Sequence, residues 1–352
     1  MKLFKLEESY EPHPFKWWHI PLAILLIAGT VYVICSNRNH DGGNLTWQRC
    51  EGNIFGTIYH ITYQNDINLQ DGIKKTLNDV DNSLSTFNPN STISAINSNQ
   101  SQSTDARLET VITKAIEISN RTKGAFDITV APFVNVWGFG FKNSENVTQE
   151  MIDSLKTFVG INKIKISEGK LMKEDPRTML DCNAIAKGYG VDAVCEYLQS
   201  KGVNSYMVEI GGEVRVSGAN PNGRQWRIGI NEPVDDSLSV NNEIQNIIET
   251  SNIAMATSGN YRNFYVKDNV KYAHTIDPLT GYPVQHSLLS STVLAKDCMT
   301  ADAYATAFMV CGIDKAKEIL KADTTIKAYF IYSKLDGTNG IWHSKGLNLE
   351  KD

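Results

Sequence analysis

Three short segments of this chain carry residue types that bind anions, hold a metal ion or move a proton. The first segment, DCNAIAKGYGVDA, runs from Asp181 to Ala193, and we expect it to join a strand at 178–180 to a helix. Backbone N–H groups at a helix N-terminus attract phosphate, Lys187 adds positive charge, and Gly188 would let an anion approach closely. A glycine-containing helix start with a solvated lysine explains the same residues equally well.

The second segment, residues 300–306 (TADAYAT), places Asp302 and Thr306 on one side of an expected helix. Side chains four positions apart direct their oxygens to the same point. Hard oxygen donors of this kind suit Mg²⁺, which also keeps waters and shares substrate phosphates. Without further information, an ordinary helix start is the stronger interpretation, with the aspartate near the helix dipole and the threonine bonded to the backbone.

The third segment, residues 272–283 (YAHTIDPLTGYP), joins a short strand to a strong turn signal. Pro278 directly after Asp277, with Gly281 closing the segment, is typical of a tight turn. His274 lies just before this turn, where its imidazole could act as a general base. A single histidine on a strand is, however, more often structural.

The glycines of the first segment, and two further segments, allow other interpretations. Gly188, Gly190 and Ala193 match the GxGxxA pattern of dinucleotide-binding proteins. In that fingerprint the first glycine forms the turn that leaves the strand, whereas here it lies well inside the segment, so an NAD-type oxidoreductase is disfavoured. Paired glycines in 211–215 (GGEVR) and small hydroxyl-bearing residues in 254–261 (AMATSGNY) both predict tight turns.

The elements that must position these segments mix helix and strand irregularly. Several strands follow one another directly, without a long βα alternation, and this favours a mixed α+β domain over a doubly wound parallel sheet. Helices are predicted by apolar residues three and four positions apart, and strands by runs of β-branched and aromatic residues. The expected helices span 67–85, 105–122, 184–201, 299–311 and 314–321, and the expected strands span 54–63, 205–210, 213–217, 226–230, 264–266, 271–276 and 328–332.

The composition is that of a folded and slightly acidic protein. Its 352 residues are 41% hydrophobic and 21% charged, and the formal net charge is -5. Nucleic-acid binders usually carry a basic face, so nucleic acid is not expected as a partner. None of the six cysteines forms a CxxC pair, which removes the zinc and redox signatures and favours scattered buried thiols.

Residues 17–35, WWHIPLAILLIAGTVYVIC, are strongly apolar. A run of about 19 apolar residues approaches the length that a helix needs to cross a bilayer, and the bulky residues at its end disfavour cleavage as a signal peptide. Lysines precede the run and only Arg38 follows closely, so the positive-inside rule places residues 1–16 in the cytoplasm. We therefore expect a single-pass anchor in the cytoplasmic membrane, a linker at 36–46, and a folded domain, 47–345, on the outer, periplasmic side.

Six motifs, taken in order, resemble the ApbE family of FAD:protein FMN transferases over roughly residues 50–335. The resemblance implies a single ApbE-like, T-fold-related α+β domain. It also implies an Mg²⁺-dependent transfer of FMN from FAD to a threonine or serine hydroxyl of a target protein, through a phosphoester bond and with release of AMP. The motifs are GAFD (124–127), DCNAIAKGY (181–189), GGEVR (211–215), ATSGNY (256–261), HTIDPLTGYP (274–283) and ADAYATA (301–307).

The resemblance also assigns roles to individual residues. Mg²⁺ would be held by the carbonyl oxygen of Ala184 with Asp302 and Thr306, and His274 would be the catalytic base. The FAD site would be formed by Phe55, Phe87, Ala125, Phe126, Asp127, Asp181, Lys187 and Ile276. Phe55 departs from the family pattern, which commonly has methionine at this position.

The acceptors that the resemblance implies are flavoproteins, such as subunits of membrane electron-transfer complexes. Residues 217–220 (SGAN) approach the family's target pattern but end in Asn220, which lacks a hydroxyl, so we do not expect self-modification. Two alternatives stay open: an FAD pyrophosphatase that releases FMN and AMP without an acceptor, and a non-catalytic flavin-binding membrane protein.

Overall fold

The computed structural model describes residues 46–140, 147–232, 244–260, 264–267 and 270–350. They belong to one compact unit, which begins at Trp47. The predicted cytoplasmic tail and anchor, and nearly all of the linker, lie outside the described residues. Among the residues that the structure describes, no helix is long and apolar enough to span a bilayer.

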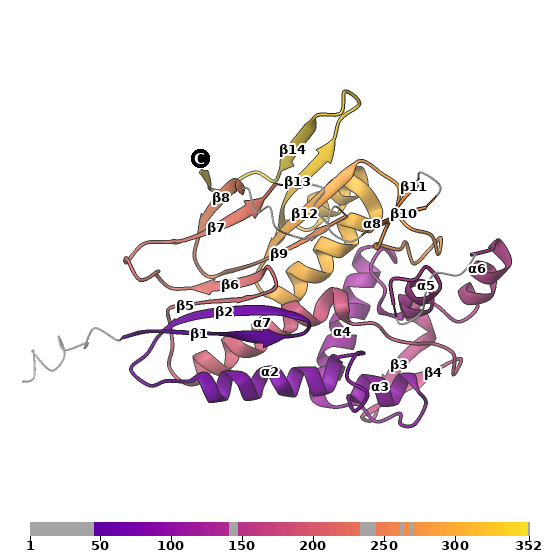
Figure 1. The fold of residues 1–352 in the computed structure, drawn as a ribbon, viewed down its shortest axis with the longest axis horizontal. Helices are drawn as coiled ribbons and strands as arrows, with labels where there is room; N and C mark the ends of the chain where they lie inside the picture. Colours follow the sequence, from indigo (N-terminus) through magenta and orange to yellow (C-terminus); the bar gives the residue numbers. More distant parts are fainter. Residues whose placement is uncertain (1–45, 141–146, 233–243, 261–263, 268–269, 351–352) are drawn as a thin grey trace, which may run out of the picture. The chain divides into compact units, whose positions relative to one another are not determined.

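An eight-stranded sheet forms the centre of the unit (Figure 1). All its neighbouring strands pair antiparallel. This confirms the predicted α+β class and excludes the doubly wound parallel sheet. The strands lie in the order β1 (Trp47–Ile54), β2 (Thr57–Gln64), β5 (Tyr206–Ile210), β6 (Glu213–Ser217), β9 (Ile253–Gly259), β12 (Leu288–Ala295), β13 (Lys327–Ser333) and β14 (Asn339–His343).

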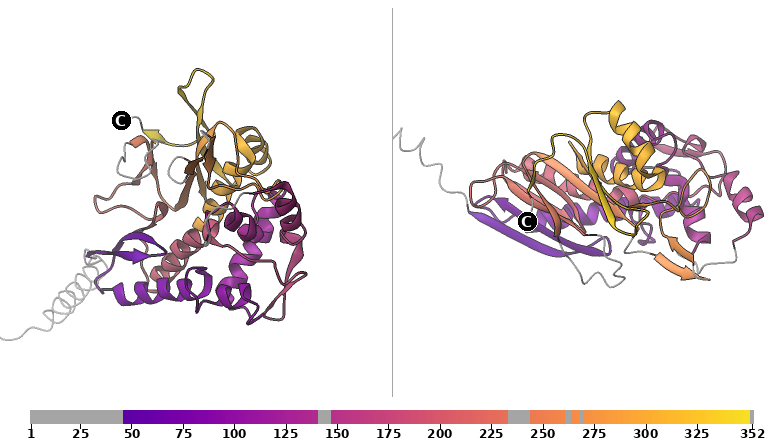
Figure 2. Two further views of the ribbon diagram at one scale, coloured as in Figure 1. Left: turned by 45° about the vertical axis from the view of Figure 1, so that its right-hand side comes forward. Right: turned by 90° about the horizontal axis from the view of Figure 1, so that it is seen from above.

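Helices α7 (Asn183–Ser200) and α8 (Cys298–Ala322) cover one face of this sheet, and further helices lie beyond and beside them (Figure 2). The other α-helices of the described residues are α2 (Gln70–Leu84), α3 (Thr92–Asn97), α4 (Ala106–Arg121), α5 (Ala131–Val136) and α6 (Gln149–Lys156). Helix α7 packs on β5 and β6, α8 packs on β9 and β12, and α2 and α4 lie against α7 and α8. The two helices that carry the predicted metal ligands and Lys187 are therefore packed directly on the sheet.

A smaller sheet covers part of the other face. Its order is β15 (Leu349–Glu350), β8 (Ile244–Thr250) and β7 (Trp226–Asn231). Apolar residues alternate along β7 because successive side chains of a strand face opposite sides. Trp226, Ile228 and Ile230 thus pack against residues of the large sheet, such as Val214 and Met255. Two separate hairpins complete the fold: β3 (Ile164–Ser167) with β4 (Lys170–Lys173), and β10 (Phe264–Lys267) with β11 (Val270–Ala273).

Hydrophobic periodicity located the long helices, and each of the seven strands predicted alongside them matches a strand of the structure to within a few residues. The two helices predicted at 299–311 and 314–321 are the two halves of α8, which is interrupted at Gly312 (φ 76°, ψ 170°). The strand predicted at 54–63 is confirmed over 57–63, which belong to β2, but its first residues are the end of β1 and the hairpin turn. Phe55 and Gly56 both have positive φ, 51° and 71°, as a tight hairpin turn between β1 and β2 requires.

The predicted turn at 254–261 was wrong, because most of this segment is the central strand β9. Small residues with hydroxyl groups are typical of turns, but here the hydroxyl of Thr257 bonds that of Thr292 on β12 at 2.8 Å. The hydroxyl groups of Thr257 and Ser258 are bonded to residues of β12 and α8, so they do not end the strand.

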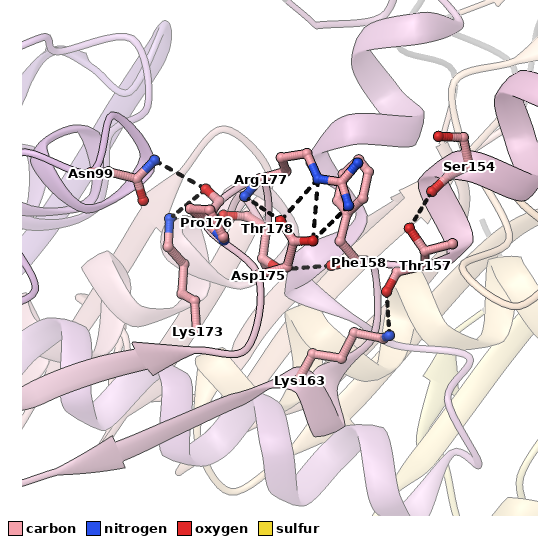
Figure 3. Close-up of polar contacts among 10 residues, drawn as sticks. All are labelled: Asn99, Ser154, Thr157, Phe158, Lys163, Lys173, Asp175, Pro176, Arg177 and Thr178. Carbon is pink, nitrogen blue, oxygen red and sulfur yellow. Dashed lines mark hydrogen bonds and ion pairs between the residues drawn. The ribbon is translucent and has the colours of Figure 1, made fainter.

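The strand predicted at 178–180 was also wrong, because side chains take the hydrogen bonds that a strand ladder would need. The ammonium group of Lys173 donates to the carbonyl of Thr178 at 3.0 Å, and the Thr178 hydroxyl donates to the carbonyl of Phe158 at 2.7 Å (Figure 3). The amide of Asn97 bonds both the N–H and the carbonyl of Leu180, each at 2.8 Å. An irregular but well-fixed segment thus leads into α7.

The dinucleotide-type glycines serve the packing of α7. A Cβ on Gly188 would lie 2.4 Å from the backbone oxygen of Cys298 in α8, and one on Gly190 would lie 2.6 Å from the ring of Phe55. Both glycines lie inside α7, far from any turn that leaves a strand. The GxGxxA match therefore reflects close helix packing, and the dinucleotide interpretation is wrong.

We predict that Gly188→Ala destabilises the fold. In an isolated helix this change would stabilise by up to about 1 kcal/mol, but here the methyl group meets α8 backbone, so a net loss of about 1–3 kcal/mol is expected. Urea denaturation measures it. The control is Gly190→Ala, where the added methyl group meets the end of the Phe55 side chain and not backbone. Equal stability of wild type and Gly188→Ala would show that α7 and α8 can separate freely.

Candidate active site

A cleft of about 1140 Å³ opens where α7 and α8 begin. Its walls also include the turn between β5 and β6, part of β7, the end of β9, and residues from the ranges 125–139 and 274–278. Most of the predicted site residues line it together: Ala125, Phe126, Asp127, Asp181, Ala184, Lys187, His274, Ile276, Asp302 and Thr306. The fold thus brings together segments that are far apart in the sequence.

The predicted metal ligands meet at the contact between the two helices. Asp302 is 3% exposed, and its Oδ2 accepts the N–H of Gly188 at 3.0 Å. An ideal helix directs that N–H to the carbonyl of Ala184, so the carboxylate lies beside this carbonyl. Thr306 lies one helical turn further along α8, with its hydroxyl 3.1 Å from that of Ser258. These are the hard oxygen donors that Mg²⁺ prefers.

A buried ion pair adds charge to the same place. Lys187 pairs with Glu213, which sequence reasoning missed although it lies in the GGEVR motif. Burial raises the pKa of Glu213, and the nearby charge of Asp302 adds to this shift. Burial alone would lower the pKa of Lys187, but Glu213 and Asp302 raise it, so the amine is protonated.

The donor set fits a divalent cation electrostatically. Two buried carboxyl groups, Glu213 and Asp302, share one ammonium group, and burial raises the pKa of both carboxyls. The Oε2 atom of Glu213 is buried and has no hydrogen-bond partner among the described residues. Buried charges of this kind are normally paired or coordinate metals. The site therefore has oxygen ligands of the kind that Mg²⁺ prefers, and one buried carboxyl oxygen that lacks a partner among the described residues.

Asp127 and Asp181 also line the cleft, but their oxygens partly hold the backbone. Asp127 accepts the N–H and hydroxyl of Thr129, at 2.8 and 2.6 Å, and its other oxygen accepts the N–H of Ile161 at 2.8 Å. Asp181 accepts the N–H of Asn183, at the start of α7, at 2.8 Å. Burial raises the pKa of both carboxyls. Asp127 thus fixes the backbone that forms this wall of the cleft, whereas Asp181 fixes the first residue of α7.

An apolar part of the cleft adjoins this polar floor. It contains the predicted Ala125, Phe126 and Ile276, together with Phe139. The Phe139 ring meets the His274 ring edge to face, with centroids 6.5 Å apart. Sequence reasoning missed Phe139, although the aromatic run of residues 137–141 (WGFGF) was a usable signal. The cleft therefore offers an apolar surface for a planar ring system and a charged floor for a polar group.

Two predicted flavin contacts lie elsewhere. Phe55 is in the β1–β2 turn and packs beside Gly190. Phe87, in the connection between α2 and α3, is 69% exposed. Neither residue is among those lining the cleft, and their contact with flavin stays a prediction.

Comparison with known proteins identifies the family. Residues 55–330 match the model of the ApbE family. The chain belongs to the ApbE family. The FAD:protein FMN transferase of Vibrio cholerae is 41% identical over 283 residues, covering 77% of this chain and 84% of that protein. The one of Haemophilus influenzae is 38% identical over 285 residues, covering 76% and 82%.

A solved structure supports the same conclusion. The flavin transferase ApbE from Vibrio cholerae superposes with a TM-score of 0.76 at 37% identity, covering 86% of this chain and 98% of that one. The mixed α+β fold therefore matches the fold of an ApbE structure.

A second buried ion pair positions α8 in this ApbE domain. Asp192 of α7 pairs with Arg215 of β6 at 2.6 Å. Its carboxylate accepts the N–H groups of Cys298 and Met299, at 3.0 and 2.8 Å, and Asp297 caps the next N–H at 2.8 Å. Free N–H groups at a helix start need such partners. Asp192 thus fixes the first turn of the helix that carries Asp302.

We predict a pH signature from Asp192. Burial raises its pKa to about 6, although Arg215 and the N–H groups of Cys298 and Met299 lower it. An unfolded aspartate titrates near about 4, so the folded protein binds more protons between these values. Its free energy of unfolding should fall by about 2–3 kcal/mol as pH rises from 4 to 6.5, relative to Asp192→Asn, which cannot titrate. Parallel urea-denaturation curves across this range would contradict the assignment.

Proposed function

We propose that this chain transfers FMN from FAD to a serine or threonine hydroxyl of another protein, forms a phosphoester bond and releases AMP. Flavinyltransferase activity is supported by membership of the ApbE family and by relatives named FAD:protein FMN transferase. The observation that carries the finer chemistry is the meeting of Asp302, Thr306, Lys187 and His274 in one cleft. The cleft volume is of the size that a large cofactor-like substrate needs.

Ala184, Asp302 and Thr306 would hold Mg²⁺, which when bound supplies neutralisation of charge on the pyrophosphate. The protonated Lys187 contributes a second positive charge beside the same floor. The apolar residues Phe126, Phe139 and Ile276 give the flavin or adenine ring a surface to pack on. Phosphoryl transfer depends mainly on such positioning and charge neutralisation.

His274 is the group placed to move a proton. It accepts the proton of the acceptor hydroxyl while the hydroxyl oxygen attacks the phosphorus of the FMN half of FAD. The bond between this phosphorus and the bridging oxygen breaks, and AMP leaves with the electron pair. Phe139 packs edge to face on the imidazole, which limits the orientations of the ring.

The apolar run at 17–35 supports a location for this activity. We propose that it anchors the chain in the cytoplasmic membrane, with the domain on the outer side. The acceptors are then electron-transfer flavoproteins that expose a hydroxyl on that side.

The decisive assay uses the detergent-solubilised full chain, FAD, Mg²⁺ and a carrier protein with an extended tail containing Ser-Gly-Ala-Thr. We expect the carrier to gain the mass of an FMN group and AMP to appear, and EDTA to stop both. Asp302→Asn should lower the rate by about a hundredfold or more, because a metal ligand and its charge are lost. Asp336→Asn, at an exposed position outside the residues that line the cleft, is the matched control.

Two other results would replace the proposal. Release of FMN and AMP with an unmodified carrier would identify an FAD pyrophosphatase. Bound FAD that is neither hydrolysed nor transferred would identify a flavin-binding protein without turnover.

We further predict that His274→Ala slows transfer by about a hundred- to ten-thousandfold, because it removes the general base. The dissociation constant of FAD should stay within about twofold, since the charged floor is intact. His343→Ala, on β14 and outside the residues that line the cleft, should behave as wild type. A His274→Ala enzyme with the full transfer rate would remove this residue from the mechanism.

A further inference from the structure

Strand β7 presents its backbone edge, and not a side-chain face, to the cleft. Ile228, Gly229 and Asn231 all line the cleft. Successive residues of a strand face opposite sides, and Ile228 is buried against the large sheet whereas Gly229 is exposed. Neighbours that face opposite sides can both line one cleft when the edge of the strand is turned towards it.

The pairing register shows which backbone groups lie on this edge. The N–H of Glu249 in β8 donates to the carbonyl of Asn348 at 3.2 Å, on the side away from β7. Glu249 is opposite Arg227, and in an antiparallel pair two opposed residues both bond each other or both point away. The N–H and carbonyl of Arg227 therefore point away from β8. The same holds for Gly229, two residues further along.

Among the described residues, the N–H and carbonyl of Gly229 thus have no hydrogen-bond partner on the side of the cleft. Within the stretches of chain that the structure describes, β7 pairs with β8 and has no strand on its other edge. A strand that paired with β7 would lie about 4.8 Å from it. The glycine-lined rim nearby leaves room for such a backbone. Gly211 and Gly212 line the cleft with positive φ, 61° and 103°, and a Cβ on Gly212 would meet no atom within 4 Å.

The glycine-lined rim of the cleft is fixed and not a loose turn. Oε1 of Glu209 accepts the N–H of Gly212 at 2.7 Å, and its Oε2 lies 2.8 Å from Nδ1 of His60 on β2. The Lys187–Glu213 pair holds the next residue of the same turn. A segment that enters along β7 would therefore meet a preformed opening beside the charged floor.

We propose that the free edge of β7 binds the acceptor protein, by pairing with an extended segment of it that carries the serine or threonine. This inference rests on the proposed transfer reaction. Backbone bonds to Gly229 hold the segment as an added strand, and the hydroxyl side chain projects into the cleft beside His274 and Asp302. Strand addition recognises mainly the main chain, with side-chain pockets at alternate positions. The enzyme would thus accept a short extended segment and not a particular folded surface.

The first test compares Gly229→Pro with Gly229→Ala. Proline removes the N–H on the free edge, a place where strands tolerate it, and alanine keeps the N–H with its Cβ 3.4 Å from Ile244, an ordinary contact. With the Ser-Gly-Ala-Thr carrier, we expect Gly229→Pro to raise the KM for the carrier about three- to tenfold, the effect of one lost hydrogen bond. Gly229→Ala keeps the N–H and should therefore raise KM less than Gly229→Pro does. The dissociation constant of FAD and the thermal midpoint report whether each variant is folded.

A second test leaves the enzyme intact and does not depend on the folding of any variant. Synthetic tail peptides are N-methylated at one backbone nitrogen at a time, and KM is measured for each. Pairing along β7 predicts that KM rises at alternate positions, since every second N–H of a strand faces its partner. A flat profile, or a Gly229→Pro enzyme that folds and keeps the wild-type KM, would overturn the docking edge. Failure of the wild type to modify any carrier would instead overturn the proposed function.

Discussion

The close approach of α7 and α8 at Gly188 is the contact on which the candidate site depends. A Cβ at this position would lie 2.4 Å from the backbone oxygen of Cys298, so only a hydrogen atom fits between the helices. The same approach lets the N–H of Gly188 reach the carboxylate of Asp302 at 3.0 Å. Glycine lowers the helix propensity of α7 at this position. In return, its lack of a side chain lets the carboxylate of Asp302 in α8 lie beside the first turns of α7.

The charged groups of the site are buried together, so the charge of each one affects the protonation of the others. Glu213 and Asp302 are almost fully buried, which would favour their neutral forms, and the ammonium of Lys187 opposes that tendency. Asp192, about one helical turn further along α7, has a similar role, because it satisfies both Arg215 and the start of α8. Polar groups in a low-dielectric interior are costly unless all are satisfied, and the incompletely satisfied floor points to a cationic ligand.

The two substrates of the proposed reaction would use different features of the same cleft. FAD would meet side chains: oxygen donors and a lysine on the floor, and aromatic residues on the wall. The acceptor would meet backbone, at the glycine-lined rim and the edge of β7. This division follows from chemistry, since a pyrophosphate and a ring system need specific groups, whereas any extended segment offers the same N–H and carbonyl groups.

The sequence by itself determined the α+β class, the long helices, and the turns at Gly211–Gly212 and at Gly281, because periodicity and turn chemistry are local. The resemblance of its motifs to the ApbE family pointed to ten of the residues that line the cleft. The sequence also placed Asp302 and Thr306 on a common face, since helical spacing fixes it. Tertiary structure alone decided that residues 254–259 are a central strand and that 178–180 are held by Lys173 and Asn97. It also revealed the buried partners Glu213 and Asp192 and turned the edge of β7 to the cleft. These features depend on groups distant in the chain, and no spacing within one segment records which strand or helix will lie opposite.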